Sequence, residues 1–432
     1  MPTTIAVTGV NNAGGYDRPL YQGSLPSSGP ITWTALATHD SGQNYPAPLR
    51  GIPYLTGSAL LQYDIDTVDW DSVMFGYDGA AFTSDPVLGW EQQIDYPFWE
   101  EFDLASSGRS IVVTPTSDSG PKLKISSDRG RTWGSQIDID YLYDLLGATD
   151  YAAQYWYEQS FSIQYNEADG YFYLLCSWMD QDTYDSTWVL LKSTTGTTWD
   201  LVKSWPCDQG GYTLMYSYCS LAVSGSHIYV AFFDESSAVY CYHSANAGST
   251  WAIYASPEAN VYGISVAAHN EFAVLYMAVY ASGAISRAVV MRTADGGTNW
   301  NQTLQVDIPV PVDSLIAQQV VRASGSVFAI TWCGVHYPYE DAAWEGADEV
   351  VHDMSGVGDP YLCFWISIDD AETWELKTAP LGWPDYWQLS LAIIITVLLR
   401  GCFWPILCLL ADDIPPCAPE KRPSTKCVTP GL

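Results

Sequence analysis

A short stretch with a turn-forming centre recurs along the chain and constrains its fold more than any other feature. The best copy runs from Ser126 to Trp133 and has the pattern Ser/Thr-x-Asp-x-Gly-x-Thr-Trp. Asp128 can accept hydrogen bonds from backbone amides two residues on, and Gly130 supplies the positive φ that other residues resist. Trp133 adds a large apolar plate at the end of the loop. The stretch therefore predicts a hairpin loop that joins two strands.

Weaker copies of this stretch return at intervals of 43 to 74 residues, measured between their closing tryptophans from Trp90 to Trp374. Asparagine replaces aspartate in one copy, alanine replaces glycine in another, and residues 83–90 and 196–199 keep only part of the pattern. Each copy follows an apolar run. The residues that define the four best copies are Ser126, Asp128, Gly130 and Trp133; Ser244, Asn246, Gly248 and Trp251; Thr293, Asp295, Gly297 and Trp300; and Ser367, Asp369 and Trp374.

A period of roughly 40–50 residues with a fixed turn signature is typical of repeat architectures, and in an all-β sequence it indicates a propeller. We predict an all-β fold with six blades, each a four-stranded antiparallel sheet, over residues 49–386. Residues 1–48 are predicted as an N-terminal arm or a ring-closing strand, and residues 387–432 as an atypical hydrophobic and basic tail. The central apolar runs do not alternate with polar residues, as expected for strands covered on both faces.

The repeated stretch resembles the Asp box, or BNR repeat, of the sialidase-like β-propeller superfamily, over about residues 50–380. The resemblance implies that the boxes lie on outer hairpins, away from the ligand face. That superfamily contains sialidases, other glycoside hydrolases, and non-enzymatic viral and surface proteins. The resemblance therefore argues for the fold and leaves the activity open.

The charge of the chain excludes one class of partner. With 17 basic and 49 acidic side chains, the formal net charge is −32, and such a surface repels nucleic-acid phosphates. The first ten residues lack the basic start and apolar core of a signal peptide. Because proteins with Asp boxes often work outside cells, we expect an extracellular or virion-associated location.

The tail has three interpretations. From Leu389 to Ala411 the chain is nearly all apolar for 23 residues, about the length of a membrane-spanning helix, and basic residues follow. Against an anchor, Arg400 lies at the centre and Pro405 would kink the helix. A buried hydrophobic element and a tail read in the wrong frame are the alternatives.

The resemblance also names catalytic candidates. A sialidase grips a carboxylate with three arginines and uses a tyrosine nucleophile. Arg50 lies where the family's first arginine enters the first blade, Tyr216 lies in a segment similar to the family's nucleophile segment, and Arg322 is a further available arginine. The inserted Gly51 turns Arg50 to the other face of a strand, and the segment of Tyr216 falls in the fourth blade. These departures favour a protein that binds without catalysis.

Aromatic and acidic residues lead into the predicted first strands of several blades. Aromatic plates with carboxylates suit neutral sugars, because sugar faces stack on the rings and hydroxyls bond to the acids. Ordinary packing near the axis is the alternative. Glu100 and Glu158 are candidates for an acid and base pair in a glycoside hydrolase. The candidate ligand-binding residues are Trp99, Trp156, Tyr157, Tyr218 and Tyr262.

One acidic group has the composition of a calcium loop. Asp64, Asp66, Asp69 and Asp71 gather within eight residues, and oxygen-rich loops can hold Ca²⁺. No EF-hand spacing is present, so a solvated acidic loop is the default, and no other metal site or cofactor is expected.

These features together predict a propeller that binds a glycan or a surface partner. The alternatives are a sialidase or other glycoside hydrolase, and a structural propeller that docks other proteins.

Overall fold

Strands make up all the regular structure that the computed structural model of the protein describes. It describes residues 3–11, 18–25, 30–39, 54–56, 59–66, 71–77, 102–107, 111–115, 122–127, 134–135, 137–138, 154–155, 161–180, 186–207, 219–233, 238–281, 284–312, 316–334, 361–377 and 386–395. No helix occurs in these ranges, and so none that is long and apolar enough to cross a membrane.

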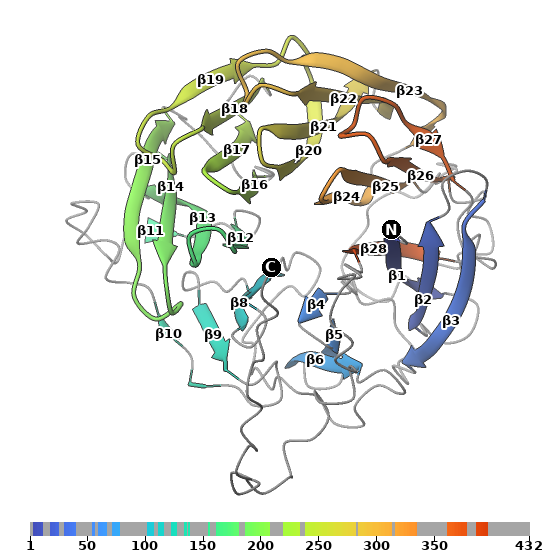
Figure 1. Ribbon diagram of the computed structural model, residues 1–432, viewed down its shortest axis with the longest axis horizontal. Coiled ribbons are helices and arrows are strands. Elements are labelled where there is room, and N and C mark those ends of the chain that lie inside the picture. The colour runs from blue at the N-terminus through green and yellow to red at the C-terminus, as the bar shows by residue number, and fades with distance from the viewer. Residues whose placement is uncertain are drawn as a thin grey trace, which may run out of the picture. The chain divides into compact units, whose positions relative to one another are not determined.

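The described strands form seven antiparallel sheets, in which strands that follow one another along the chain usually pair (Figure 1). Five have four strands, one has five, and one has three. The strand orders are β28-β1-β2-β3, β4-β5-β6, β10-β9-β8-β7, β11-β13-β14-β15 with β12 also on β13, β16-β17-β18-β19, β20-β21-β22-β23 and β24-β25-β26-β27.

The first four sheets contain strands β1 to β15 and the last strand of the chain, β28. They are β1 (Thr3–Asn11), β2 (Arg18–Leu25), β3 (Thr32–His39), β28 (Tyr386–Ile395), β4 (Tyr54–Thr56), β5 (Ala59–Asp66), β6 (Asp71–Tyr77), β7 (Phe102–Ser106), β8 (Ile111–Pro115), β9 (Lys122–Ser126), β10 (Ile137–Asp138), β11 (Gln154–Tyr155), β12 (Phe161–Asn166), β13 (Tyr171–Asp180), β14 (Ser186–Ser193) and β15 (Asp200–Cys207).

The other three sheets are named here after their first strands. The β16 sheet contains β16 (Cys219–Ser224), β17 (His227–Phe233), β18 (Val239–Ser244) and β19 (Ala252–Ala255). The β20 sheet contains β20 (Val261–His269), β21 (Phe272–Ala281), β22 (Ala284–Thr293) and β23 (Asn301–Val312). The β24 sheet contains β24 (Ile316–Ser324), β25 (Val327–Gly334), β26 (Tyr361–Ser367) and β27 (Glu375–Leu376).

The seven sheets differ from the six predicted blades because the two ends of the chain share a sheet. The segment predicted as an arm or a ring-closing strand contains β1, β2 and β3, and β28 pairs with β1 in antiparallel register from Thr3 opposite Ile395 to Asn11 opposite Tyr386. Residues 389–395 of the proposed membrane helix are therefore strand, and residues 396–411 lie outside the described residues. Composition does not distinguish a buried strand from a helix in a long apolar run, and only the pairing with β1 shows that these residues form a strand.

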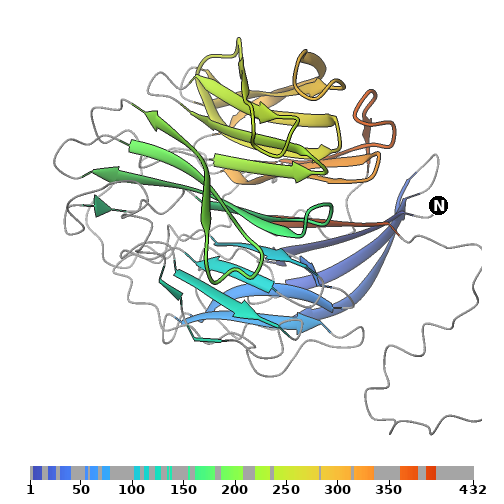
Figure 2. The same cartoon turned by 60° about the vertical axis from the view of Figure 1, so that its left-hand side comes forward.

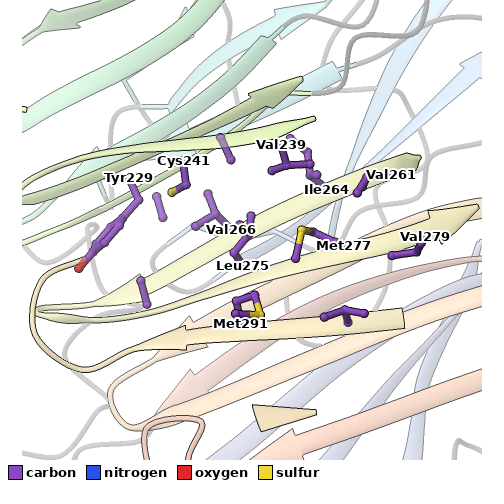
Figure 3. Packing of buried hydrophobic residues seen from close by; sticks show 14 residues of the cluster. Tyr229, Val239, Cys241, Val261, Ile264, Val266, Leu275, Met277, Val279 and Met291 are labelled. Carbon is purple, nitrogen blue, oxygen red and sulfur yellow. The ribbon is translucent and has the colours of Figure 1, made fainter. Parts of the chain in front are cut away.

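Apolar residues on the central strands face alternately toward the sheet before and the sheet after. On β21, Leu275 and Met277 belong to the cluster shared with the β16 sheet, while Val274 and Tyr276 belong to the cluster shared with the β24 sheet. Figure 3 shows the first of these clusters, in which Cys241 of β18 lies among side chains of both sheets. Because both faces are buried, the strand is apolar at every position, as the continuous runs predicted.

Neighbouring sheets make contact mainly through one strand each, called the first strand of its sheet from here on: β7, β12, β16, β20, β24, β28 and β4. β7 contacts β12, β12 contacts β16, β16 contacts β20, and β20 contacts β24 (Figure 2). The series continues, because β24 contacts β28, β28 contacts β4, and β4 contacts β7.

Candidate functional site

The first strands of adjacent sheets are joined by side chains that hydrogen-bond to the backbone of the next strand. In β12, Ser162 Oγ accepts from Leu221 N at 3.3 Å, and Gln164 Oε1 accepts from Val223 N at 3.0 Å. Both bonds join residues 59 positions apart, so the bonded position moves forward by two residues on β12 and by two residues on β16. The two strands therefore run in the same direction.

The same pattern joins β16 to β20. Ser220 Oγ accepts from Val266 N at 2.9 Å, and Ser224 Oγ accepts from Asn270 N at 2.8 Å, each across 46 residues. β20 thus runs parallel to β16 and β12. The beginnings of all three strands lie at one end of their sheets, and their last residues lie at the other end.

Gln164 makes the strongest of these links. Its Nε2 donates to Leu221 O at 2.5 Å, while its Oε1 accepts from Val223 N. The side-chain amide therefore bonds to the β16 backbone as the backbone of a paired strand would.

Gln164→Ala should lower the free energy of unfolding by about 1–3 kcal/mol, because two partly buried backbone groups lose their partner. Gln302→Ala is the matched control, since that exposed amide bonds only at 3.3 Å to Gln305 on its own strand, and we expect a change within about 0.5 kcal/mol. Urea denaturation measures both, and equal losses would contradict this role for Gln164.

The repeated turn stretches, called boxes from here on, close by bonds between their own residues, as the copy in the β20 sheet shows. Thr293 Oγ1 accepts from Gly297 N at 2.9 Å and donates to Asp295 Oδ1 at 2.9 Å. Asp295 Oδ1 also accepts from Asn299 N at 2.9 Å, and the bonds from Asn299 lower the pKa of the Asp295 carboxyl. The copies that begin at Ser244 and Ser367 have the same three bonds.

Each of these boxes is also tied to the hairpin between the first two strands of its own sheet. The amide at the fourth position of the box donates to a carbonyl in that hairpin, and the hairpin follows the last residue of the first strand. The boxes therefore lie at the end where the first strands finish. The three bonds are Ala247 N to Ser226 O at 2.8 Å, Gly296 N to Glu271 O at 3.0 Å, and Asp370 N to Ser326 O at 3.0 Å.

The closing tryptophan of each box contacts the fourth strand of the preceding sheet. The Trp300 ring stacks on Tyr254 of β19 at 5.1 Å between centroids, and Trp374 Nε1 donates to Thr303 Oγ1 of β23 at 3.1 Å. Trp251 meets Trp205 of β15 edge-on at 5.1 Å. A box thus joins two neighbouring sheets as well as two strands of its own sheet.

The candidate binding and catalytic side chains lie outside the part of the chain whose side chains the structure describes. Two of them can be placed on strands. Tyr262 is the second residue of β20, at an irregularity in its pairing with β21, and Arg322 pairs with Ala329 in β24. The residues outside the described ranges are Arg50, Trp99, Glu100, Trp156, Tyr157, Glu158, Tyr216 and Tyr218, and the box residues Asp128, Gly130 and Trp133.

The acidic group proposed as a calcium loop is spread over two paired strands. Asp64 and Asp66 lie in β5, and Asp71, which begins β6, pairs with Asp66. Asp69 lies outside the described residues. The prediction of a single loop is therefore wrong, because the strands extend further into the acidic segment than its composition suggests. No group of three or more potential metal ligands occurs among the residues that the structure describes.

An ion pair lies at the end where the first strands begin, and its partners are far apart in the sequence. Glu258, three residues before β20, accepts a charged hydrogen bond from Arg287 of β22. The Glu258 side chain is 14% exposed and that of Arg287 is 37% exposed, so the pair is partly shielded from water. The sequence does not predict this pair, because no spacing rule connects Arg287 to Glu258.

Comparison with known proteins gives structural likeness without sequence relatives. No protein-family model matches the chain, and no curated protein matches it. The fold resembles the BP39L lectin from Burkholderia pseudomallei with a TM-score of 0.50 and 12% identity, over 87% of this chain and 98% of that chain. This likeness extends to nearly the whole lectin, and at such low identity it concerns the fold alone.

Two further lectins are similar at lower scores. The SapL1 lectin in complex with alpha methyl fucoside has a TM-score of 0.42 and 15% identity, covering 77% of this chain and 96% of that chain. The Aleuria aurantia lectin, described as a six-bladed β-propeller with a novel fucose recognition mode, has a TM-score of 0.39 and 13% identity over 72% and 97%.

Proposed function

We propose that the chain is a seven-bladed β-propeller that binds glycans without cleaving them, at the end where the first strands begin. The succession of contacts from β4 through β7, β12, β16, β20 and β24 to β28 supports the blade count. Under this proposal β28 completes the blade made by β1, β2 and β3, so that the last strand of the chain joins the first.

The observation that carries the proposal is the parallel alignment of β12, β16 and β20. Because these strands begin at one end, the segments that lead into them start from the same end of neighbouring sheets. The aromatic residues of interest stand next to those beginnings in the sequence: Tyr157 four residues before β12, Tyr218 one residue before β16, and Tyr262 within β20. Tryptophan and tyrosine rings at neighbouring sites would offer apolar faces to sugar rings.

The Asp boxes occupy the other end and leave this end free for a ligand. Their hydrogen bonds are made within the box and to the adjacent hairpin, and their tryptophans pack on the preceding sheet. The boxes therefore have a structural role, which agrees with the position that the Asp-box resemblance implies.

The sialidase alternative requires three arginines around one carboxylate. Arg287 already pairs with Glu258, and Arg292 Nε donates to Asp370 O at 2.6 Å at the box end. Neither guanidinium is free to join Arg50 in a cluster, which favours binding over sialic acid hydrolysis.

A binding experiment with matched variants tests the proposal. The full chain is screened on a glycan array that includes methyl α-fucoside, the ligand of the SapL1 complex, and affinities for any hit are measured by calorimetry. Tyr157→Ala and Tyr218→Ala should each weaken binding about tenfold, equivalent to about 1.4 kcal/mol. Tyr171→Ala is the control, because Tyr171 begins β13 at the box end, and its affinity should match the unmodified protein.

The proposal fails if no glycan binds, or if both lead-in variants bind as tightly as the control. Turnover of a fluorogenic sialoside that Arg50→Ala abolishes would instead establish the enzyme.

A further inference from the structure

The box of the β20 sheet rests on two histidines of the preceding sheet. Gly297 lies so close to His243 that an added Cβ would come within 2.4 Å of the imidazole Cγ, and one on Gly296 would come within 3.0 Å of His227 Cε1. His227 begins β17 and His243 lies near the end of β18, so both rings lie at the box end of the β16 sheet.

His243 is enclosed at this contact. It is only 7% exposed, and Nδ1 of the neighbouring His227 is buried without a hydrogen-bond partner. The Tyr229 ring lies near both histidines, with its centroid 6.3 Å from His227 and 6.4 Å from His243. Burying a cation without a close partner is costly, so this contact favours a neutral His243 ring.

The charged groups around the pair are few. Asp295 on the box hairpin attracts a proton toward His243, while a charge on either histidine opposes a charge on the other. Glu271, in the hairpin after β20, lies near Tyr229, whose hydroxyl donates to the Glu271 carbonyl at 3.2 Å. Asp295 is exposed and already accepts bonds from Asn299, so it offers only a partial counter-charge.

The equivalent position in neighbouring sheets holds residues that stay charged at neutral pH. His243 is the residue before its sheet's box, and the corresponding residues are Lys192 and Arg292. Arg292 Nε donates to Asp370 O in the next box, and Lys192 lies over the Tyr171 ring at 5.0 Å. Of these three residue types, only histidine has an ordinary pKa that puts its change of charge between pH 5 and 8.

We propose that the contact between the 293–300 hairpin and the β16 sheet is a pH-responsive joint, which loosens when His243 takes up a proton. Protonation puts a cation against the hairpin, and the hairpin must move away to hydrate it. The joint therefore opens at this one box while the neighbouring boxes keep their contacts.

The direction in which the stability of the joint changes with pH follows from the burial of His243. Burial lowers the pKa of its imidazole below the ordinary 6.5, with Asp295 and a backbone bond at Gly296 acting in the opposite direction. An opened or unfolded joint therefore binds protons more readily, so stability is complete above about pH 6.5 and falls as the pH drops toward the lowered pKa. Protonation of the 49 acidic side chains reduces charge repulsion, but mainly near pH 4, so it does not produce a loss between pH 7.5 and 5.5.

Hydrogen exchange of the full chain at pH 7.5 and 5.5, corrected for the intrinsic exchange rate, tests the joint. For peptides covering 293–300, the opening constant should rise at pH 5.5 by up to about tenfold, because His243 must stay neutral in the closed state. The double variant His227→Gln with His243→Gln should lose most of this rise. His269→Gln is the control and should keep it, because His269 faces the next box, with its Nδ1 3.5 Å from Asp370 Oδ1.

An opening constant that is unchanged between the two pH values, or that rises equally in the double variant, overturns the proposal. If the double variant does not fold, imidazole NMR titration of the unmodified protein decides, and a His243 pKa at or above 6.5 overturns it. Glycan binding enters none of these measurements.

Discussion

Gly297→Ala is expected to lower the free energy of unfolding by about 2–5 kcal/mol, which combines backbone strain with overpacking. Gly297 has φ +89°, a conformation that side chains with a Cβ resist, and the new methyl would lie 2.4 Å from His243 Cγ. The ring has little room to retreat, because His243 is 7% exposed and the Tyr229 ring lies 6.4 Å from it between centroids. Urea denaturation followed by tryptophan fluorescence measures the loss.

Gly170→Ala separates the two contributions. Gly170 also has positive φ, +76°, but the nearest atom to an added Cβ is Tyr165 Oη at 3.9 Å. This variant should therefore show only the strain, about 1–2 kcal/mol. Equal losses at the two glycines would contradict the close approach of the box to His243. In a His243→Ala background, Gly297→Ala should lose less than in the unmodified protein, because the obstructing ring is gone.

Trp188→Ala is expected to lower the free energy of unfolding by about 3–5 kcal/mol, through lost burial and the cavity left behind. Trp188 of β14 is completely buried between its own sheet and the β16 sheet. Its ring stacks on Phe232 of β17 with centroids 5.3 Å apart, so the substitution removes contacts that hold two sheets together. Chemical denaturation, with the slope checked for two-state behaviour, gives the value.

Two further variants serve as comparisons for Trp188→Ala. Trp188→Phe should lose clearly less than Trp188→Ala, because it keeps an aromatic ring against Phe232 and removes an indole N–H that has no hydrogen-bond partner. Ile253→Ala removes an apolar side chain that is 52% exposed on β19, and its change should stay within about 0.5 kcal/mol. A loss at Trp188 as small as that at Ile253 would mean that the sheets do not depend on this contact.

The boxes could be predicted from the sequence because their bonds are local. The bonded groups lie within seven residues: the hydroxyl of Thr293, the carboxylate of Asp295 and the amide of Asn299. Residue type and spacing therefore determine which groups form hydrogen bonds with one another. What the pattern did not show is where the tryptophans go. Trp300 and Trp374 contact the preceding sheet, where their partners are Tyr254 and Thr303. These partners lie 46 and 71 positions earlier in the sequence.

The sheet count could not be derived in the same way. The strand made by Thr3–Asn11 carries no box, and its partner Tyr386–Ile395 lies in an apolar run long enough to be a helix. The candidate site shows the same limit, since the pairing of Glu258 with Arg287 depends on how β20 and β22 lie in one sheet.

The sequence alone determined the class of structure, the turn chemistry of the boxes and the strands buried on both faces, because each depends on residues close together in the chain. Only the tertiary structure decided that the two ends of the chain share a sheet and that first strands run in parallel, joined by side chains such as Gln164. It also brought the 293–300 box against His243. These are contacts between residues far apart in sequence, and neither spacing nor composition specifies which distant surfaces meet.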